Sequence, residues 1–421
     1  MKRWIVILVV IMLMQSGCAN RPVERDVTLR VLYFDTDEFM TKYGNVFSAK
    51  HPNIDFEVIP LSDYYKQGLS EKTLKQLIKT EQPDIVYVEE TFFDSIISEG
   101  MLVKLDPYIN KSRNLKIEEV NPNLLEYLRS KGQGNIYALT PTFSAKALFY
   151  NKRLFDQYGV DYPVDGVSWE DVFKLATTIT KSATNKSDFV GLYYDKTLFG
   201  MAVDIAASQG VRYIGTAGSQ ATINTSSWEN VLGPILEGAK AGTLKTRESI
   251  NKIEENPGNF PFTSGNIAMT VDYSYLMDDL LNADFEWDVV TAPVDPAYSK
   301  SASAILPNAL FGIYSGSSKM EESWKFIEYI NGSEFANTYQ SSNDFSVLLS
   351  RDGYYSQLNK NWKAFYSITP SDIPNIPIST EQNDEIFKIA NQQLWKAIND
   401  DINMKELLSS LQNEIQTIIN H

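Results

Sequence analysis

Histidine and cysteine are the scarcest residues of this 421-residue chain. It has two histidines, His51 and the terminal His421, and a single cysteine, Cys18. His51 stands directly before Pro52, which ends a predicted helix, so neither histidine is placed to act as the base of a Ser-His-Asp or Cys-His catalytic centre. Zinc sites lack ligands for the same reason. One cysteine allows no intrachain disulfide, so the folded chain must rely on its hydrophobic core.

Positive charge and phosphate-binding glycines are also scarce. The formal net charge is −15 at pH 7, which repels nucleic acid, so we expect no nucleic-acid partner. The sequence contains neither a GxxxxGK[ST] loop nor a glycine-rich dinucleotide fingerprint, and DTDEFMTKYGNV (35–46) lacks the glycine and terminal glutamate of a calcium loop. We therefore expect no cofactor and no metal site. Carboxylate chemistry stays open, because two acids suffice for glycoside hydrolysis.

Long apolar runs are absent apart from one short stretch at the N-terminus. Lys2 and Arg3 give a positive start, and residues 4–14 are all apolar, which is shorter than the about 20 residues that a membrane-spanning helix needs. This layout predicts a cleaved signal peptide over residues 1–17. Ser16, Gly17 and Cys18 resemble the end of a bacterial lipoprotein signal. The resemblance implies lipidation of Cys18 and a polar tether (18–27) that holds the protein on the extracytoplasmic face of the cell membrane.

After residue 27, strand patterns alternate with helix patterns. β-branched and aromatic residues dominate VTLRVLYFD (27–35), IDFEVIP (54–60) and DIVYV (84–88), and a segment with apolar residues at helical spacing follows each. Such alternation predicts parallel strands in a doubly wound α/β sheet. Further strand patterns occur at FVGLYYD (189–195) and NIAMTV (266–271). Because the mature chain exceeds one typical core, we expect two α/β domains.

Polar residues follow several of the predicted strands. Ligands of doubly wound sheets bind outside the carboxyl ends of the strands, so these positions are candidates for a binding site: Asp35 and Thr36, then Glu89, Glu90 and Thr91, then Tyr194 and Asp195, and finally Asp272, Tyr273 and Tyr275. For the first two groups an alternative is equally good. Asp, Glu and Thr also cap helix N-termini and complement the helix dipole.

Four stretches together resemble one protein family. They are PDIVYVEETFFDSIISEGMLVKLDPYI (83–109), YALTPTFSAKALFYNKRLF (137–155), GNIAMTVDYSYL (265–276) and ALFGIYSGSSKMEESWKFIEYI (309–330). Their order and content resemble the extracellular solute-binding proteins of ABC importers, in particular the carbohydrate group that includes maltose-binding protein. The resemblance covers nearly the whole mature chain. No single motif is specific, but the ordered set is.

The resemblance implies a periplasmic-binding-protein-like fold of type II, in which two doubly wound αβ lobes close on a solute. Three crossing segments would join the lobes, at residues 141–144, near 293–307 and near 351–354. Lobe 1 would then comprise residues 28–141 plus 304–350, and lobe 2 residues 142–303 plus 351–421. Pro141, Thr142 and Phe143 would form the hinge.

The resemblance also implies roles for single residues. The candidate loops fall on the two cleft faces that the family uses, and the crossing segments add the polar side chains of Ser144 and Asn308. Where sugar binders often have a tryptophan that stacks on the ring, this chain has Tyr275, with Asp272 and Tyr273 in place of small residues. Tyr273 either fills space meant for sugar or supplies the stacking face itself.

These observations predict a binding protein and no enzyme. Tyrosines and acids suit the apolar face and the hydroxyl groups of a sugar, and the candidate loops contain no arginine for a carboxylate or phosphate. We expect a monomer that binds a neutral sugar or oligosaccharide, or less readily a cationic solute, and delivers it to the permease subunits of an ABC transporter. The alternatives are a secreted glycoside hydrolase with paired carboxylates and a sensory solute-binding lipoprotein.

Overall fold

The computed structural model describes residues 27–183, 189–249, 261–295, 301–302, 305–338, 345–349, 359–367, 369–370 and 378–420. The predicted signal peptide, Cys18, the tether up to residue 26 and the third predicted crossing segment lie outside these residues. The chain divides into two compact units. Unit 1 contains the described residues up to Tyr87 together with Gly316–Phe326, and unit 2 contains the described residues of Val88–Ser315 and Ile327–His421.

Unit 1 is built on parallel strands. Strand β1 (Val27–Tyr33) pairs in parallel with β2 (Ile54–Pro60) and with β3 (Ile85–Val88). Between β1 and β2 the chain forms α2 (Thr36–Phe39), a π-helical turn (Met40–Gly44) and α3 (Asn45–Lys50), and between β2 and β3 it forms α4 (Ser62–Lys66) and α5 (Glu71–Glu81). The parallel arrangement predicted for these strands is therefore confirmed.

Helix α5 shows how the sequence specifies this unit. Ser70 caps its N-terminus by accepting a hydrogen bond from the backbone N–H of Thr73. Leu74, Leu77 and Ile78, which share one helical face, are all buried. The helix ends at Gln82, whose left-handed backbone returns the chain toward β3.

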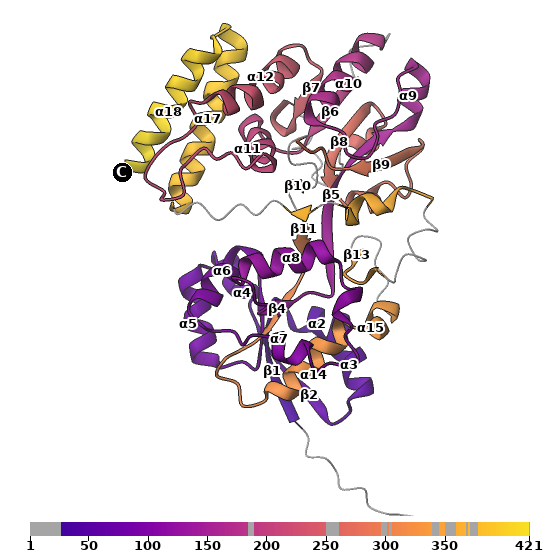
Figure 1. Ribbon diagram of the computed structural model, residues 1–421, viewed down its shortest axis with the longest axis vertical. Coiled ribbons are helices and arrows are strands. Elements are labelled where there is room, and N and C mark those ends of the chain that lie inside the picture. The colour runs from indigo at the N-terminus through magenta and orange to yellow at the C-terminus, as the bar shows by residue number, and fades with distance from the viewer. Residues whose placement is uncertain are drawn as a thin grey trace, which may run out of the picture. The chain divides into compact units, whose positions relative to one another are not determined.

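Unit 2 holds most of the remaining elements (Figure 1). Its helices are α6 (Glu90–Ser98), α7 (Asp106–Ile109), α8 (Pro122–Lys131), α9 (Lys152–Tyr158), α10 (Trp169–Ser182), α11 (Leu198–Ser208), α12 (Ser226–Lys240), α13 (Leu276–Asp279), α15 (Ser333–Thr338), α17 (Thr380–Asp400) and α18 (Met404–Asn420). Helix α14 (Met320–Ile330) begins in unit 1. Short 3₁₀ turns lie at Ile117–Glu119, Arg247–Ser249, Pro261–Ser264 and Trp362–Tyr366.

The strands of unit 2 form a mixed sheet in the order β11-β5-β8-β6-β7, with β9 and β13 also paired to β5. These strands are β5 (Thr142–Asn151), β6 (Val190–Tyr194), β7 (Leu244–Thr246), β8 (Ile267–Tyr273), β9 (Trp287–Thr291), β11 (Ile305–Pro307) and β13 (Phe345–Ser346). The shorter pairs are β4 (Ala138–Leu139) with β12 (Leu310–Ile313), and β10 (Ser301–Ala302) with β14 (Thr369–Pro370).

Strand β5 is buried along its whole length and changes partners midway. Its first residues pair with β11 and β13, and from Lys146 onward it pairs with β8 and β9. Strand β6 pairs in parallel with both β7 and β8. Gly191 of β6 lies close to α10, since a Cβ atom there would stand 2.4 Å from the carbonyl oxygen of Ala176.

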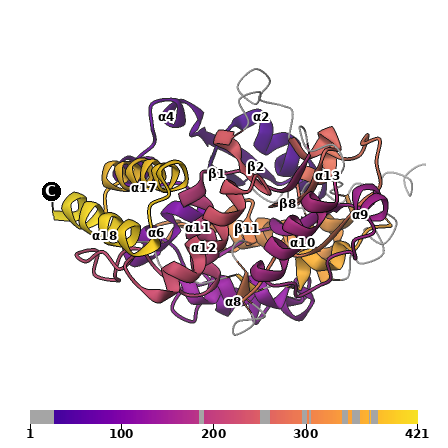
Figure 2. The ribbon, with the colours of Figure 1, turned by 90° about the horizontal axis from the view of Figure 1, so that it is seen from above.

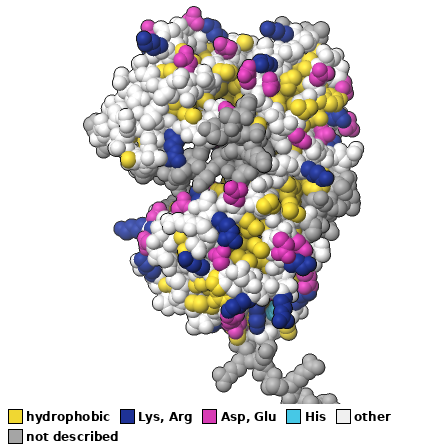
Figure 3. Space-filling view, in the orientation of Figure 1, with side chains coloured by type: hydrophobic (Ala, Val, Ile, Leu, Met, Phe, Trp, Pro, Cys, Tyr) yellow, Lys and Arg dark blue, Asp and Glu magenta, His cyan; other side chains and the backbone are white. Residues whose placement is uncertain are grey.

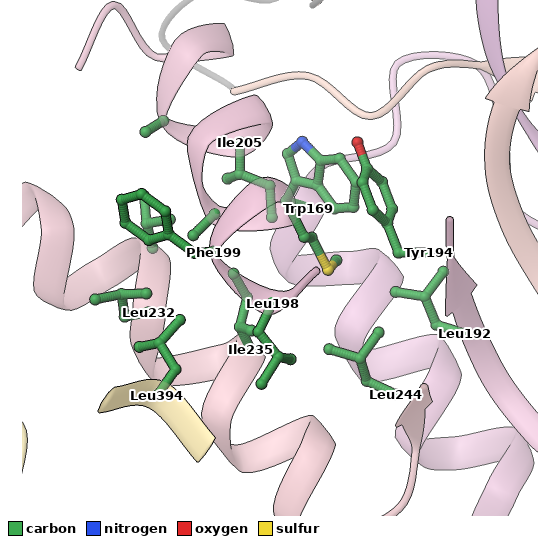
Figure 4. Close-up of a cluster of buried hydrophobic side chains, with 14 of the residues drawn as sticks. Trp169, Leu192, Tyr194, Leu198, Phe199, Ile205, Leu232, Ile235, Leu244 and Leu394 are labelled. Atoms are coloured by element: carbon green, nitrogen blue, oxygen red, sulfur yellow. The ribbon is translucent and has the colours of Figure 1, made fainter. Parts of the chain in front are cut away.

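The core of unit 2 packs helices against one side of this sheet. Figure 4 shows Leu198, Phe199 and Ile205 of α11 among Leu232 and Ile235 of α12, Leu394 of α17 and Leu192 of β6. Trp169, the first residue of α10, packs edge-on against Tyr194 at the end of β6, with ring centroids 6.0 Å apart. The core thus holds the carboxyl end of β6 in a fixed position, because close-packed interiors resist displacement.

The two C-terminal helices complete unit 2. Helices α17 and α18 lie side by side in both ribbon views (Figures 1 and 2). Leu407, Leu408, Leu411, Ile415 and Ile418 of α18 are all buried, so the apolar stripe of this helix belongs to the core. Among the described residues, no helix is long and apolar enough to cross a membrane. Acidic and basic side chains are interspersed over the face that Figure 3 shows.

Candidate functional site

The carboxyl ends of three parallel strands of unit 2 share one edge of the sheet. Asp195 follows β6, Arg247 follows β7, and Tyr273 ends β8. Strand β5 runs antiparallel to β8, and its register places Lys146 directly opposite Tyr273. The edge therefore collects side chains from four strands, although these residues lie far apart in the sequence.

Asp204 of α11 accepts hydrogen bonds from three side chains near this edge. It accepts hydrogen bonds from the ammonium of Lys146 at 2.8 Å, the hydroxyl of Tyr194 at 2.7 Å and the ammonium of Lys196 at 2.9 Å. Burial opposes the ionisation of Asp204, but the two ammonium groups outweigh it and hold the pKa of this carboxyl below its usual value. Burial lowers the pKa of Lys146, and the Asp204 carboxylate partly offsets that shift.

Asp195 forms a second ion pair at the same edge. The guanidinium of Arg247 donates to both of its oxygens, at 3.0 and 2.5 Å, and the hydroxyl of Tyr193 donates at 2.7 Å. Burial would raise the pKa of Asp195, yet the Arg247 and Tyr193 hydrogen bonds hold it below its usual value. The two-pronged contact uses the planar geometry of the guanidinium.

Asp272 is in a different electrostatic state. Its side chain is 7% exposed and accepts a hydrogen bond from the backbone N–H of Tyr273 at 2.7 Å. Burial raises the pKa of this carboxyl to about 6, and the nearby charge of Asp195 adds to the shift, while Lys146 and a hydrogen bond from Tyr275 oppose it. Asp272 is thus a buried acceptor whose charge is only moderately favoured at neutral pH.

Two tyrosines provide an aromatic surface beside Asp272. The rings of Tyr273 and Tyr275 are stacked, with centroids 5.5 Å apart and planes 28° from parallel. Tyr275 is 38% exposed, and the ammonium of Lys146 lies 5.2 Å from the centroid of the Tyr273 ring. Burial is the main cause that raises the pKa of Tyr273, and the carboxylates of Asp204, Glu90 and Asp272 add to it. Both hydroxyls are therefore neutral donors at physiological pH.

The predicted crossing residues are brought together at the start of β5. Ser144 donates from its hydroxyl to the side-chain oxygen of Asn308 at 3.0 Å, and the Asn308 backbone N–H donates to the carbonyl of Thr142 at 3.1 Å. The carbonyl of Pro141 accepts from the N–H of Val347 at 3.2 Å. Phe143 is fully buried, with its ring against Phe345 and Tyr366. These side chains hold β5 where its pairing partners change.

The predicted loop after β3 contacts helix α8 of unit 2. Glu89 occupies the N-cap position of α6 without a side-chain capping bond. Glu90 accepts a hydrogen bond from the hydroxyl of Tyr127 and lies 3.9 Å from the ammonium of Lys131. Thr91 is exposed in the first turn of the helix. The capping alternative thus explains the backbone position of Glu89 but not its side chain.

Asp35 and Thr36 belong to unit 1. The Asp35 carboxylate accepts from the backbone N–H groups of Asp37 and Glu38, at 2.9 and 3.1 Å, and so caps helix α2. Thr36 is the exposed first residue of that helix. The capping role weighed for Asp35 is confirmed, and its role in binding stays a prediction.

Sequence reasoning missed four of the six charged groups at the sheet edge. Lys146, Lys196, Asp204 and Arg247 were not among the candidates. The candidate loops contain no arginine, as the sequence shows, but Arg247 from outside them contacts Asp195. One signal was available: Lys146 is the only charged residue in the buried strand TFSAKALFYN (142–151). Within the described ranges, no group of three or more His, Cys, Asp or Glu side chains could hold a metal ion.

Comparisons with known proteins agree with one another. A family model described as bacterial extracellular solute-binding protein matches residues 34–336. A family 1 extracellular solute-binding protein from Alicyclobacillus acidocaldarius is similar over 94% of this chain and 100% of its own, with 15% identity and a TM-score of 0.72. The sugar-binding protein MalE from Xanthomonas citri is similar over 94% and 98%, with 14% identity and a TM-score of 0.68. An ABC substrate-binding protein from Listeria monocytogenes, in complex with cycloalternan, is similar over 94% and 100%, with 20% identity and a TM-score of 0.62.

Proposed function

Because this chain belongs to the bacterial extracellular solute-binding protein family, we propose that it captures a neutral carbohydrate outside the cell and delivers it to the permease of an ABC importer. The family match confirms the predicted family and the predicted binding role, and it sets aside the glycoside hydrolase alternative. The similar structures confirm the predicted two-lobed, periplasmic-binding-protein-like α/β fold.

The observation that carries the proposed ligand class is the sheet edge of unit 2. It places Tyr275, which is 38% exposed, beside the buried acceptor Asp272. A sugar presents an apolar C–H face and donating hydroxyl groups, and an aromatic ring with a neighbouring carboxylate matches both. The ion pairs with Asp195 and Asp204 occupy the nearby cations. Among the described residues of this edge, anionic solutes therefore find no guanidinium that is not already paired. This agrees with the cycloalternan and the sugar-binding role that are named for two similar structures.

The finer features of the proposal rest on the sequence. Lipidation of Cys18 would keep the protein at the extracytoplasmic face of the membrane, and a lobe hinge at Pro141, Thr142 and Phe143 would fit the change of partners along β5. The lobe boundaries, the contribution of Asp35, Thr36, Glu89, Glu90, Thr91, Ser144 and Asn308 to solute binding, and the monomeric state are predictions. A mass spectrum of the mature protein in which Cys18 is present and carries no lipid would contradict the anchor.

A thermal-shift screen followed by calorimetry tests the function. A bound solute raises the apparent melting temperature by mass action, so we expect one or more neutral sugars to raise it and to bind with measurable heat. Amino acids, peptides and polyamines serve as the comparison panel. If members of that panel stabilise the protein and neutral sugars do not, the proposed ligand class is wrong.

A further inference from the structure

Lys146 is a buried charge that the proposed sugar contacts do not require. Its side chain is 6% exposed, in a strand whose other members are all buried. An ammonium in such a position is costly unless it is paired and hydrogen-bonded. A neutral side chain of similar length could fill the same space without that cost, so the charge itself calls for a function.

The ammonium of Lys146 lies over two tyrosine rings. It is 5.2 Å from the ring centroid of Tyr273 and 5.6 Å from that of Tyr194, and it donates to Asp204 at 2.8 Å. The face of an aromatic ring attracts cations at such distances. Tyrosines beside carboxylates are therefore the natural place for a cationic solute, and the protein fills that place with its own ammonium.

Lys146 also sets the charge balance of the sheet edge. Asp195 is matched by Arg247, while Asp204 is shared by Lys146 and Lys196. Asp204 has one negative charge and two ammonium partners, so one positive charge remains to balance the carboxylate of Asp272. Lys146 favours the ionised form of Asp272. With all six groups charged the edge is neutral, and without Lys146 it would carry one excess negative charge.

We infer that Lys146 is the residue that makes this site select neutral polyhydroxy solutes over cationic ones. The inference rests on the proposed function and deepens it. The position over the tyrosine rings that would attract an amine is already occupied by the Lys146 ammonium, and the six charges of the edge sum to zero. A sugar hydroxyl can still contact the Asp272 carboxylate and the Tyr275 ring.

Three trisaccharides of different charge test this selection. Calorimetry at neutral pH compares maltotriose, the cationic glucosamine trimer and the anionic galacturonic acid trimer. The wild-type protein should bind the neutral trimer best. In Lys146→Met the affinity ratio of cationic to neutral trimer should rise by about tenfold or more, because one excess negative charge attracts the amines. The double variant Lys146→Met with Asp204→Asn, which removes both partners together, should shift the ratio in the same direction by less. Folded variants that keep the wild-type ratio would overturn the inference.

A matched control and a ligand-free measurement separate the two proposals. Lys360→Met removes another largely buried lysine, 18% exposed and 4.5 Å from the ring centroid of Trp287, and should keep the wild-type ratio. Carboxyl NMR of the ligand-free protein should show a higher pKa for Asp272 in Lys146→Met than in wild type. An unchanged Asp272 pKa contradicts the inference even when no trisaccharide binds. If the wild type binds none of the three, the carbohydrate proposal loses support while the NMR result still decides the role of Lys146.

Discussion

Asp35 in unit 1 and Asp272 in unit 2 occupy comparable places, since one follows and the other nearly ends a strand with parallel neighbours. Their surroundings differ. The Asp35 carboxylate accepts hydrogen bonds from two backbone N–H groups of the next helix. Asp272 lies among Tyr273, Tyr275 and Lys146, with burial that raises its pKa to about 6. Position after a strand therefore brings an acid to the sheet edge, and the neighbouring side chains decide whether it caps a helix or is available for chemistry.

The largest expected effect comes from breaking the buried ion pair of unit 2. Asp204→Ala removes the shared acceptor of Lys146, Lys196 and Tyr194, so an ammonium is left buried without its counter-ion. We expect a loss of about 3 to 5 kcal/mol in the free energy of unfolding, measured by urea denaturation. Asp63→Ala, which removes an exposed pair with Lys66 in unit 1, should leave stability nearly unchanged. If Asp204→Ala and Asp63→Ala lowered the free energy of unfolding equally, the buried pair of unit 2 would be no more important for stability than the exposed pair of unit 1.

The next effect concerns the aromatic surface. Tyr275→Ala should weaken the binding of the solute found by screening by about 1 to 3 kcal/mol, because the stacking face is lost. Calorimetry measures the change. Tyr162→Ala is the matched control, since Tyr162 is 37% exposed and lies outside the cluster. An affinity that survives the Tyr275 change, or falls equally in the control, counts against this surface.

A pH-dependent effect follows from the raised pKa of Asp272. Between about pH 4 and pH 6 the folded chain holds a proton on Asp272 that the unfolded chain has lost, so ionisation of this group lowers stability as the pH rises through that window. Once Asp272 is fully ionised, at pH values above about 6, the loss of stability caused by its ionisation reaches its full value. Asp272→Asn should therefore raise the free energy of unfolding at neutral pH by about 3 kcal/mol, with a gain that disappears near pH 4.

Denaturant titrations at several pH values measure this difference between Asp272→Asn and wild type. The same variant should bind the screened sugar more weakly, because an amide accepts hydrogen bonds less strongly than a carboxylate. A gain in stability that is constant with pH would show that Asp272 does not titrate in this window.

The smallest effect concerns the cap in unit 1. Asp35→Ala should lower the free energy of unfolding by about 1 kcal/mol, and Asp35→Ser should restore most of it, because serine is also a good N-cap. Thermal or urea unfolding measures both. If Asp35→Ser keeps its stability but loses solute affinity, the carboxylate contacts the solute as well, and the contrast with Asp272 disappears.

The sequence predicted the helices and strands better than it predicted which side chains contact one another. The strands over 27–35, 54–60 and 84–88 and the apolar face of α5 are confirmed because periodicity reports burial directly. Arg247 was missed because β7 has only three residues, too few for a pattern. Asp204 was missed because a single acid on a helix gives no signal until its partner is known.

The partners of Lys146 depend on strand register. The pairing of Lys146 with Tyr273 requires the antiparallel alignment of β5 and β8, whose residues are more than a hundred positions apart. A lone lysine in a buried strand predicts that a counter-ion exists, but no local pattern identifies Asp204 as that counter-ion. These partners of Lys146 can be identified only from the folded structure, which brings distant segments of the sequence together.

The most direct test is an NMR titration of the full chain with ¹³C-labelled tyrosine and the neutral sugar that gives the largest thermal shift. Ring signals of Tyr273 and Tyr275, assigned with Tyr→Phe variants, should move with the sugar concentration and saturate at the calorimetric stoichiometry. Saturable binding that leaves both rings unperturbed would contradict the assignment of the solute to the edge formed by β6, β7 and β8.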